Sequence, residues 1–180
     1  MDKRKALKKG LIFTAFLALI VFISGAALTV TYRLAQDRII QQKRIKVEKM
    51  IKGIFLDMTD YTYDKDEDLY LIYSSGNLIG YAFLAKGKGY GGEIDILVGL
   101  EDENTVKGIR IVRHSETPGL GSRITGDSFL AQFKNINIDD VFLKSEGGKI
   151  DAITGSTISS KAVTEAVYKT AKEKVRLLEK

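Results

Sequence analysis

The stretch Asp151-Ala152-Ile153-Thr154-Gly155-Ser156-Thr157 is a small polar turn that stands immediately before a long amphipathic pattern at the C-terminus. Gly155 lets the backbone adopt turn geometry and approach a ligand closely. Beyond the turn, apolar residues recur at steps of three and four, which predicts a helix with one apolar face. The residues of that face are Ile158, Ala162, Val163, Ala166, Val167, Ala171, Val175 and Leu178.

The beginning of this predicted helix has two interpretations. Its free N–H groups and positive dipole end favour an anion at or near Thr157. Alternatively, Thr157 or Ser159 simply N-caps the helix, as Ser and Thr commonly do. Because caps far outnumber anion sites in proteins, the residue types alone favour a cap.

Composition restricts the chemistry of the chain. Its 180 residues suffice for one domain with a real core and an accessory segment. The absence of cysteine excludes disulfides, thiolate metal sites, iron–sulfur clusters and cysteine nucleophiles. With a single histidine, a zinc site is not expected either, so the sequence predicts no metal ligands.

The net charge of +5 is unevenly distributed. Basic residues crowd positions 1–9, and others follow an apolar run, between positions 33 and 52. Anionic lipid headgroups explain basic residues that flank a membrane segment. No nucleic acid is expected as a partner, because no pattern of aromatic stacking residues accompanies the charge.

An uncharged and mostly apolar run covers residues 10–32. About 23 residues at about 1.5 Å each give roughly 35 Å, enough to cross the hydrocarbon core of a bilayer. A cleavable signal peptide is the competing interpretation, since Ser24-Gly25-Ala26 is a passable cleavage site. The run continues through Leu28 and Val30, which is longer than a signal peptide needs, so we expect a retained transmembrane helix.

The flanks of this run predict its orientation and its continuation. The densest basic cluster lies in residues 1–9, which predicts a cytoplasmic tail, a single pass of the inner membrane and an extracytoplasmic globular part. Residues 33–56 contain no proline and carry apolar residues at roughly helical spacing. We expect them to form a juxtamembrane helical stalk on the lipid or domain surface. The globular domain is expected at 57–180.

The middle of the chain predicts an antiparallel sheet. Residues 69–73 and 78–85 have the pattern of two strands joined by a short hairpin loop. Residues 93–98 and 106–112 add further strands. The predicted fold class is therefore α+β, a mainly antiparallel sheet packed with helices and preceded by one N-terminal transmembrane helix.

Two further segments complete this expectation. Residues 122–133 predict a short helical or irregular stretch with Phe129 and Phe133 inward. Apolar residues between positions 136 and 150 suggest another strand, which leads back to the turn at 151–157.

Two patterns in the middle of the chain resemble ligand loops without the context that such loops need. Asp64, Asp66 and Asp68 alternate as in a calcium loop, but Leu69 stands where the loop needs glycine, so a solvated acidic turn is expected. A G-x-G-x-x-G spacing begins at position 87, but a strand rather than a helix follows it. We interpret it as a glycine-rich connection, which could lie close to a ligand.

Residues 113–121 form a second loop, Arg113-His114-Ser115-Glu116-Thr117-Pro118-Gly119-Leu120-Gly121. Proline fixes φ and the two glycines free it, which predicts a rigid, bent loop with exposed backbone amides. An ordinary Pro-Gly turn is the simpler interpretation of the Pro-Gly pair alone. A hydrolase built on His114 and Ser115 is not favoured, as neither sits in a nucleophile-elbow pattern.

The turn at 151–157 resembles the flavinylation motif of FMN-binding domains. In that family an acidic residue, a hydroxyl residue, glycine and a small residue precede a threonine that a dedicated transferase esterifies to the FMN phosphate. The resemblance assigns covalent attachment of FMN to Thr157. The surrounding motif is Asp151, Thr154, Gly155 and Ser156, where serine replaces the commoner alanine.

The loop at 113–121 resembles the segment that borders the isoalloxazine ring in the same domains. This resemblance places Glu116, Thr117, Gly119 and Leu120 near the flavin. Two motifs in the usual order of one family are far more specific than either motif alone. Together with the membrane segment, they make the chain similar to the G subunit of the Rnf electron-transport complex and to the related C subunit of the sodium-pumping NADH:quinone oxidoreductase.

The resemblance implies a membrane-anchored subunit of an ion-translocating electron-transport complex, whose covalent FMN relays electrons. The compact length of the chain favours a subunit of the ferredoxin:NAD type of complex over one of the NADH:quinone type. Implied partners are the other membrane subunits, a flavin transferase and the lipid bilayer. No residue needs to act as a general acid or base, because the flavin supplies the redox chemistry.

Two alternatives remain open on the sequence. One is a stand-alone membrane-anchored flavoprotein reductase that uses the same covalent FMN. The other is an anchored ligand-binding or envelope domain without redox function, in which the threonine turn is only a helix cap.

Overall fold

The computed structural model describes the backbone of residues 3–178, and the side chains of this range except those of 3–12 and 33–44. The chain divides into two compact units, residues 1–47 and 48–180. The first contains most of helix α1, Lys3–Ile54. Parts of the expected tail at 1–9 and of the expected stalk at 33–56 lie outside the described residues and side chains.

Within α1, the segment Phe13–Tyr32 is long and apolar enough to cross a membrane, and none of its side chains is buried. Its 20 residues span about 30 Å at the helical rise, the thickness of a bilayer's hydrocarbon core. The hydroxyls of Thr29 and Thr31 donate hydrogen bonds to backbone carbonyls one turn earlier, at 2.8 and 2.9 Å. These hydroxyls are thereby satisfied within the helix, as a lipid environment requires.

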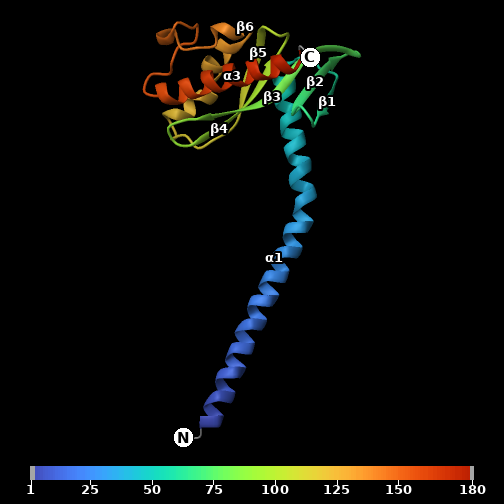
Figure 1. Cartoon of the computed structure of the whole chain (residues 1–180), viewed down its shortest axis with the longest axis vertical. Helices are drawn as coiled ribbons and strands as arrows, with labels where there is room; N and C mark the ends of the chain where they lie inside the picture. The colour runs from blue at the N-terminus through green and yellow to red at the C-terminus, as the bar shows by residue number, and fades with distance from the viewer. Residues whose placement is uncertain (1–2, 179–180) are drawn as a thin grey trace. The chain divides into compact units, whose positions relative to one another are not determined.

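The globular unit is built on one six-stranded antiparallel sheet in the order β1-β2-β3-β4-β5-β6 (Figure 1). Each strand pairs with its neighbour in the sequence, so short turns suffice to connect most of them. The strands are β1 Asp60–Asp64, β2 Leu69–Ser74, β3 Asn77–Lys88, β4 Glu93–Leu100, β5 Thr105–His114 and β6 Ile136–Asn137. The predicted α+β class with a mainly antiparallel sheet is confirmed.

The helix α3, Thr157–Leu178, packs on one face of this sheet and closes the main core. Six of the predicted apolar-face residues are buried, from Ala162 to Val175. Alternate residues of β3 and β4 meet them, such as Phe83 and Val98, which are paired in register. This packing places the first turn of α3 beside the ends of β3 and β4.

The last turn of α1 lies on the opposite face of the sheet. Ile51 and Phe55 are buried, and the Phe55 ring lies over Gly80 and Gly99. A Cβ on Gly99 would stand 2.8 Å from the Phe55 ring, so glycine is needed for this close approach. The end of α1 is thus part of the domain core rather than a solvated linker.

The hairpins agree with the sequence pattern. β2 and β3 are joined by a two-residue turn, Ser75 and Gly76, both with positive φ, as tight hairpins prefer. The acidic cluster forms the turn between β1 and β2, where Asp64 accepts hydrogen bonds from the backbone N–H of Asp66 at 2.9 Å and of Glu67 at 3.3 Å. β1 itself was not anticipated.

Between β5 and α3 the chain forms short helices. These are η1 Gly121–Thr125, α2 Asp127–Leu130, η2 Ala131–Phe133, η3 Ile138–Asp140 and η4 Lys144–Glu146. Phe129 and Phe133 are buried, as predicted, and their rings meet edge to face at 5.4 Å.

The expected strand at 136–150 is wrong beyond the two residues of β6. The side chain of Asn137 accepts from the N–H of Asp139 at 2.9 Å, which starts a helical turn in place of a strand. Ile138 and Val141 are still fully buried. The apolar spacing therefore reported burial correctly, but not backbone conformation.

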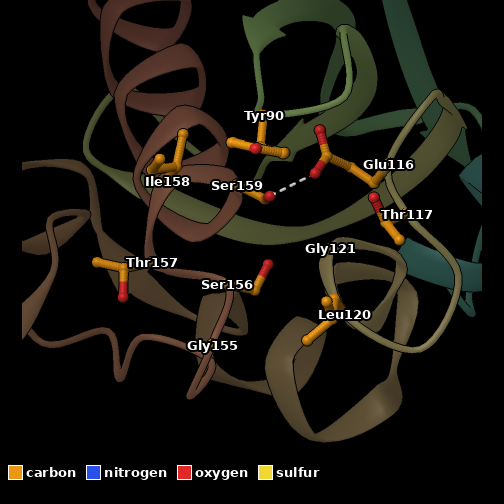
Figure 2. Close-up of a pocket in the computed structure, with 10 residues that line it drawn as sticks. All are labelled: Tyr90, Glu116, Thr117, Leu120, Gly121, Gly155, Ser156, Thr157, Ile158 and Ser159. Carbon is orange, nitrogen blue, oxygen red and sulfur yellow. Dashed lines mark hydrogen bonds between the residues drawn. The ribbon is translucent and has the colours of Figure 1, made fainter.

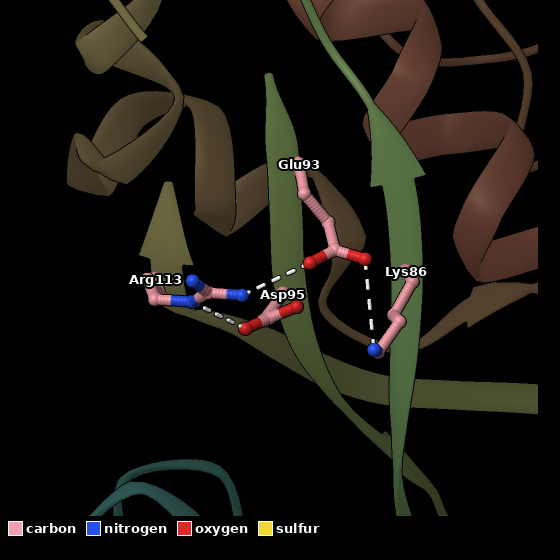
Figure 3. A network of polar contacts seen from close by, with 4 residues as sticks. All are labelled: Lys86, Glu93, Asp95 and Arg113. Carbon is pink, nitrogen blue, oxygen red and sulfur yellow. Dashed lines mark hydrogen bonds and ion pairs between the residues drawn. The ribbon is translucent and has the colours of Figure 1, made fainter. Parts of the chain in front are cut away.

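A polar network crosses the ends of β3, β4 and β5 (Figure 3). The guanidinium of Arg113 donates to Asp95 at 2.8 Å and to Glu93 at 3.0 Å, and Lys86 lies 3.5 Å from Glu93. The hydrogen bond to Asp95, followed by its charge, raises the pKa of Arg113. These contacts link the strand ends from which the 89–92 turn and the 115–121 loop emerge.

Candidate functional site

A cavity of about 430 Å³ opens where the start of α3 meets the 89–92 turn and the 116–121 loop (Figure 2). Three segments that are distant in the sequence contribute its walls. The lining residues are Tyr90, Glu116, Thr117, Leu120, Gly121, Gly155, Ser156, Thr157, Ile158 and Ser159. The two loops singled out by sequence motifs therefore meet at one place.

The first turn of α3 faces this cavity with unused polar groups. Gly155 has φ +78°, a left-handed conformation that lets the chain turn into the helix. Ser156 is 5% exposed, and its Oγ has no hydrogen-bond partner. Thr157 begins the helix and is exposed.

The hydroxyls of Ser156 and Ser159 do not cap the helix. The hydroxyl of Ser159 donates to Glu116 at 2.5 Å, and that of Ser160 donates to the carbonyl of Ser156 at 2.9 Å. Ser156 holds the position before the first helical residue, yet its Oγ makes no capping bond. The start of α3 therefore keeps an unpaired buried donor beside the cavity.

Apolar side chains form the rim of the cavity. Tyr90, Leu120 and Ile158 are 76%, 52% and 56% exposed. The sequence placed Ile158 on the inward face of the C-terminal helix, which is wrong, because Ile158 lines the open cavity while its neighbours Ser159 and Ser160 are buried. Such a group of exposed apolar side chains around a hollow is a typical setting for an organic ligand.

Glu116 is buried at 6% exposure beside the same cavity. Its Oε1 accepts from the backbone N–H of Gly91 at 3.0 Å, and its Oε2 accepts from the hydroxyl of Ser159. A Cβ on Gly89 or Gly121 would collide with the Glu116 carboxylate. The glycine-rich connection therefore leaves room for this side chain, which its spacing alone did not indicate.

The loop predicted at 113–121 begins after His114, where β5 ends, and is bent, as predicted. Several of its backbone amides donate hydrogen bonds within the loop. The N–H of Glu116 donates to Nδ1 of His114 at 3.2 Å. The carbonyl of Thr117 accepts from Leu120 and Ser122, both at 3.2 Å, and the N–H of Gly119 donates to the Ser122 hydroxyl at 2.9 Å. These bonds stiffen the loop and leave fewer free amides than the sequence suggested.

Three of the predicted site residues do not line the cavity. Asp151 is exposed and pairs with Lys144 at 2.8 Å. Thr154 is exposed, and its carbonyl accepts from Arg123 at 3.5 Å. Gly119 has φ +78° and borders open space. The other six, Glu116, Thr117, Leu120, Gly155, Ser156 and Thr157, do line it.

Sequence reasoning missed four lining residues: Tyr90, Gly121, Ile158 and Ser159. Tyr90 lies inside the glycine-rich connection, where an exposed aromatic residue between glycines was an available signal. Ile158 and Ser159 directly follow the threonine turn. Their roles depend on where the first turn of α3 points, which local pattern does not specify.

The arrangement suits a ligand that has a flat, apolar ring system and an anionic group. The rim supplies apolar contact, while the start of a 22-residue helix and the free Ser156 hydroxyl favour an anion. Arg123 adds a cation beside the turn. Among the described residues, no group of histidine and acidic side chains could hold a metal ion.

Comparisons with known proteins show which family the chain resembles. A family model described as FMN-binding domain matches residues 89–172, which include the cavity. The crystal structure of the C subunit of a Na⁺-translocating NADH-quinone reductase from Parabacteroides distasonis superposes with a TM-score of 0.52 and 26% identity, covering 62% of each chain.

Curated relatives cover most of the chain. The G subunit of an ion-translocating oxidoreductase complex from Methanosarcina acetivorans is 36% identical over 79% of this chain and 81% of the relative. The G subunit of a proton-translocating ferredoxin:NAD⁺ oxidoreductase complex from Clostridium ljungdahlii is 34% identical over 86% of this chain and 85% of the relative. The chain therefore belongs to the family of G subunits of ion-translocating oxidoreductase complexes.

Proposed function

We propose that this chain is a membrane-anchored electron-transfer subunit of an ion-translocating complex, of the ferredoxin:NAD⁺ rather than the NADH:quinone type. Its redox group is FMN, bound in the cavity and esterified through its phosphate to Thr157. The observation that carries the proposal is the position of Thr157, an exposed hydroxyl at the start of α3, beside a cavity with an unpaired buried donor.

The residues of the cavity fit FMN in size and in chemistry. A volume of about 430 Å³ lies within the ~300–1,000 Å³ usual for cofactor sites. Tyr90, Leu120 and Ile158 offer apolar contact to a flat ring system. The Ser156 hydroxyl and the amides at the start of α3 offer donors to a phosphate.

The flavin supplies the redox chemistry, and the chain binds, orients and electrically tunes it. Attachment forms a bond from Thr157 Oγ1 to phosphorus and displaces a leaving group from an activated flavin donor, with loss of the hydroxyl proton. We assign this step to a separate flavin transferase. Exposure of Thr157 lets such a transferase reach the hydroxyl, and the surrounding turn, Asp151 and Thr154 included, is exposed as well.

The anchor has a physical purpose in this proposal. A single transmembrane helix at 10–32, with a cytoplasmic tail at 1–9, confines the domain at 57–180 to the membrane surface. The stalk proposed at 33–56 joins the two, and its last turn packs in the domain core. Confinement raises the concentration of its flavin near partner subunits in the bilayer. A covalent bond prevents loss of the cofactor on the extracytoplasmic side, where free FMN would diffuse away.

Coexpression with a flavin transferase tests the attachment. The denatured polypeptide should fluoresce as a gel band under ultraviolet light, and the peptide that contains Thr157 should carry the mass of FMN less one water. Thr157→Ala should abolish both signals. Thr117→Ala, which alters another cavity threonine, should retain the covalent flavin.

The same experiment separates the alternatives. A colourless wild-type chain made beside an active transferase would favour an anchored domain without redox function. Covalent flavin together with substrate turnover by the purified chain alone would favour a stand-alone reductase. We expect covalent flavin without such turnover, and copurification with other membrane subunits from native membranes.

A further inference from the structure

Glu116 is a buried carboxylate to which the proposed function gives no task. It lies in the 115–121 loop, yet its two oxygens contact two other walls of the cavity. One wall is the turn that carries Tyr90, and the other is the first turn of α3. Burial of such a group is costly unless its oxygens are paired, so its partners show what the side chain does.

The two hydrogen bonds form a clasp between segments far apart in the sequence. Gly91 lies 25 positions before Glu116, and Ser159 lies 43 positions after it. Gly91 is the neighbour of Tyr90, and Ser159 is two residues after Thr157. Figure 2 shows the Ser159 and Glu116 side chains pointing toward each other across the cavity wall.

The clasp leaves a negative charge without a cationic partner. The ion pairs found among the described residues do not include Glu116. Both of its oxygens accept hydrogen bonds, as in an ionised carboxylate. The 2.5 Å separation from the Ser159 oxygen is that of a charge-assisted hydroxyl–carboxylate bond.

We infer that Glu116 is a positioning residue of the cavity, which fixes the Tyr90 turn against the start of α3 and holds one negative charge beside the bound flavin. The electrostatic half of this inference rests on the proposed function. Reduction of a flavin adds electrons, and a nearby negative charge opposes that addition. The carboxylate therefore lowers the reduction potential of the site.

The variant Glu116→Gln tests the charge while it keeps the shape. Its amide oxygen still accepts from Gly91, and its NH₂ donates to the Ser159 oxygen. In the flavin-loaded full chain, a redox titration should show the equilibrium moved about tenfold toward reduced flavin, or about 30 mV for a two-electron couple.

Glu101→Gln is the matched control. It removes the same charge beyond the far end of β4, where Glu101 pairs with Lys107 at 3.0 Å and does not line this cavity. Its flavin potential should equal that of the wild type. Equal flavin potentials in Glu116→Gln and the wild type would overturn the inference that the Glu116 charge lowers the reduction potential.

Amide exchange tests the clasp without any cofactor. In the full chain in detergent, Glu116→Ala should speed hydrogen exchange at the Gly91 N–H at least about tenfold, because its acceptor is lost. Glu116→Gln keeps an acceptor oxygen and should exchange like the wild type. If the alanine variant does not fold, slow exchange of the Gly91 N–H in the wild type is the deciding result. Rapid exchange at Gly91 in the wild type, or no change in Glu116→Ala, would overturn the clasp.

Failure of the proposed function would give a different result. A wild-type chain that never acquires flavin would refute the electron-relay proposal and, with it, the electrostatic half. The exchange measurement would still decide whether Glu116 joins the two walls.

Discussion

Gly87 of β3 lies so close to Ala162 of α3 that a methyl group on Gly87 would stand 2.6 Å from the Ala162 carbonyl oxygen. Gly87 pairs with Ile94 of β4, which is fully buried, so this contact is made on the core face of the sheet. The absence of a side chain at position 87 allows the second turn of α3 to touch the strand backbone. This contact fixes the height of the cavity-forming turn of α3 above the sheet.

Gly87→Ala should therefore push α3 away from β3. Overpacking of this kind typically costs about 1–3 kcal/mol of unfolding free energy. Urea denaturation of the full chain in detergent would measure it. Gly108→Ala is the control, because the nearest atom to its added methyl group would lie at an ordinary 3.6 Å, in Ile54. Equal losses in the two variants would contradict the role given to Gly87.

Ser156→Ala should stabilise the chain that lacks flavin. A buried donor without a partner costs about 1–3 kcal/mol, and alanine removes it. If Ser156 were a helix cap, the same change would instead destabilise by about 1 kcal/mol. Thermal unfolding of the cofactor-free wild type and of the variant shows whether the substitution raises or lowers the stability.

The gain from Ser156→Ala should shrink or vanish in the flavin-loaded chain, since the phosphate would then accept the serine hydrogen bond. Attachment itself should survive, because alanine is the commoner residue of the flavinylation motif at this position. An identical gain with and without flavin would show that the hydroxyl does not meet the phosphate.

The phenol of Tyr63 should lose its proton only at an unusually high pH. Its hydroxyl donates to Asp68 at 2.7 Å, and this bond, with lesser effects of burial and neighbouring acids, raises the pKa of Tyr63 to about 12. The unfolded value is about 10, so the bond stabilises the fold fully below about pH 10. That contribution is lost as the pH rises through about 12.

Ultraviolet titration of phenolate absorbance would test this, with Tyr63→Phe subtracted to isolate one of eight tyrosines. Asp68→Asn should return the pKa of Tyr63 toward about 10. Asparagine tolerates the positive φ of 49° at this position, so the turn should persist. A late transition that survives in Asp68→Asn would contradict the assignment.

The membrane orientation can be tested with an introduced thiol, because the chain contains no cysteine. Asp66→Cys places one thiol on the exposed turn between β1 and β2. A membrane-impermeant maleimide should label it in intact spheroplasts, if the domain is extracytoplasmic. Asp2→Cys, in the basic N-terminal tail, should be labelled only after lysis. The reverse pattern would invert the proposed topology.

Local sequence patterns predicted the elements whose signal is contained within a few turns of chain. The apolar run that yields Phe13–Tyr32, the hairpin of β2 and β3, and the long helix α3 all follow from periodicity and composition. Motif resemblance further identified both loops of the cavity. These signals lie in neighbouring residues, so they survive without knowledge of the fold.

The tertiary structure alone decided which of these side chains meet. It turned Ile158 outward, replaced the expected strand after β6 with short helical turns, and set the end of α1 into the core. It also brought Glu116 to Ser159 across 43 positions. Such contacts depend on how the sheet and α3 pack together, and a period of two or of 3.6 residues carries no information about that packing.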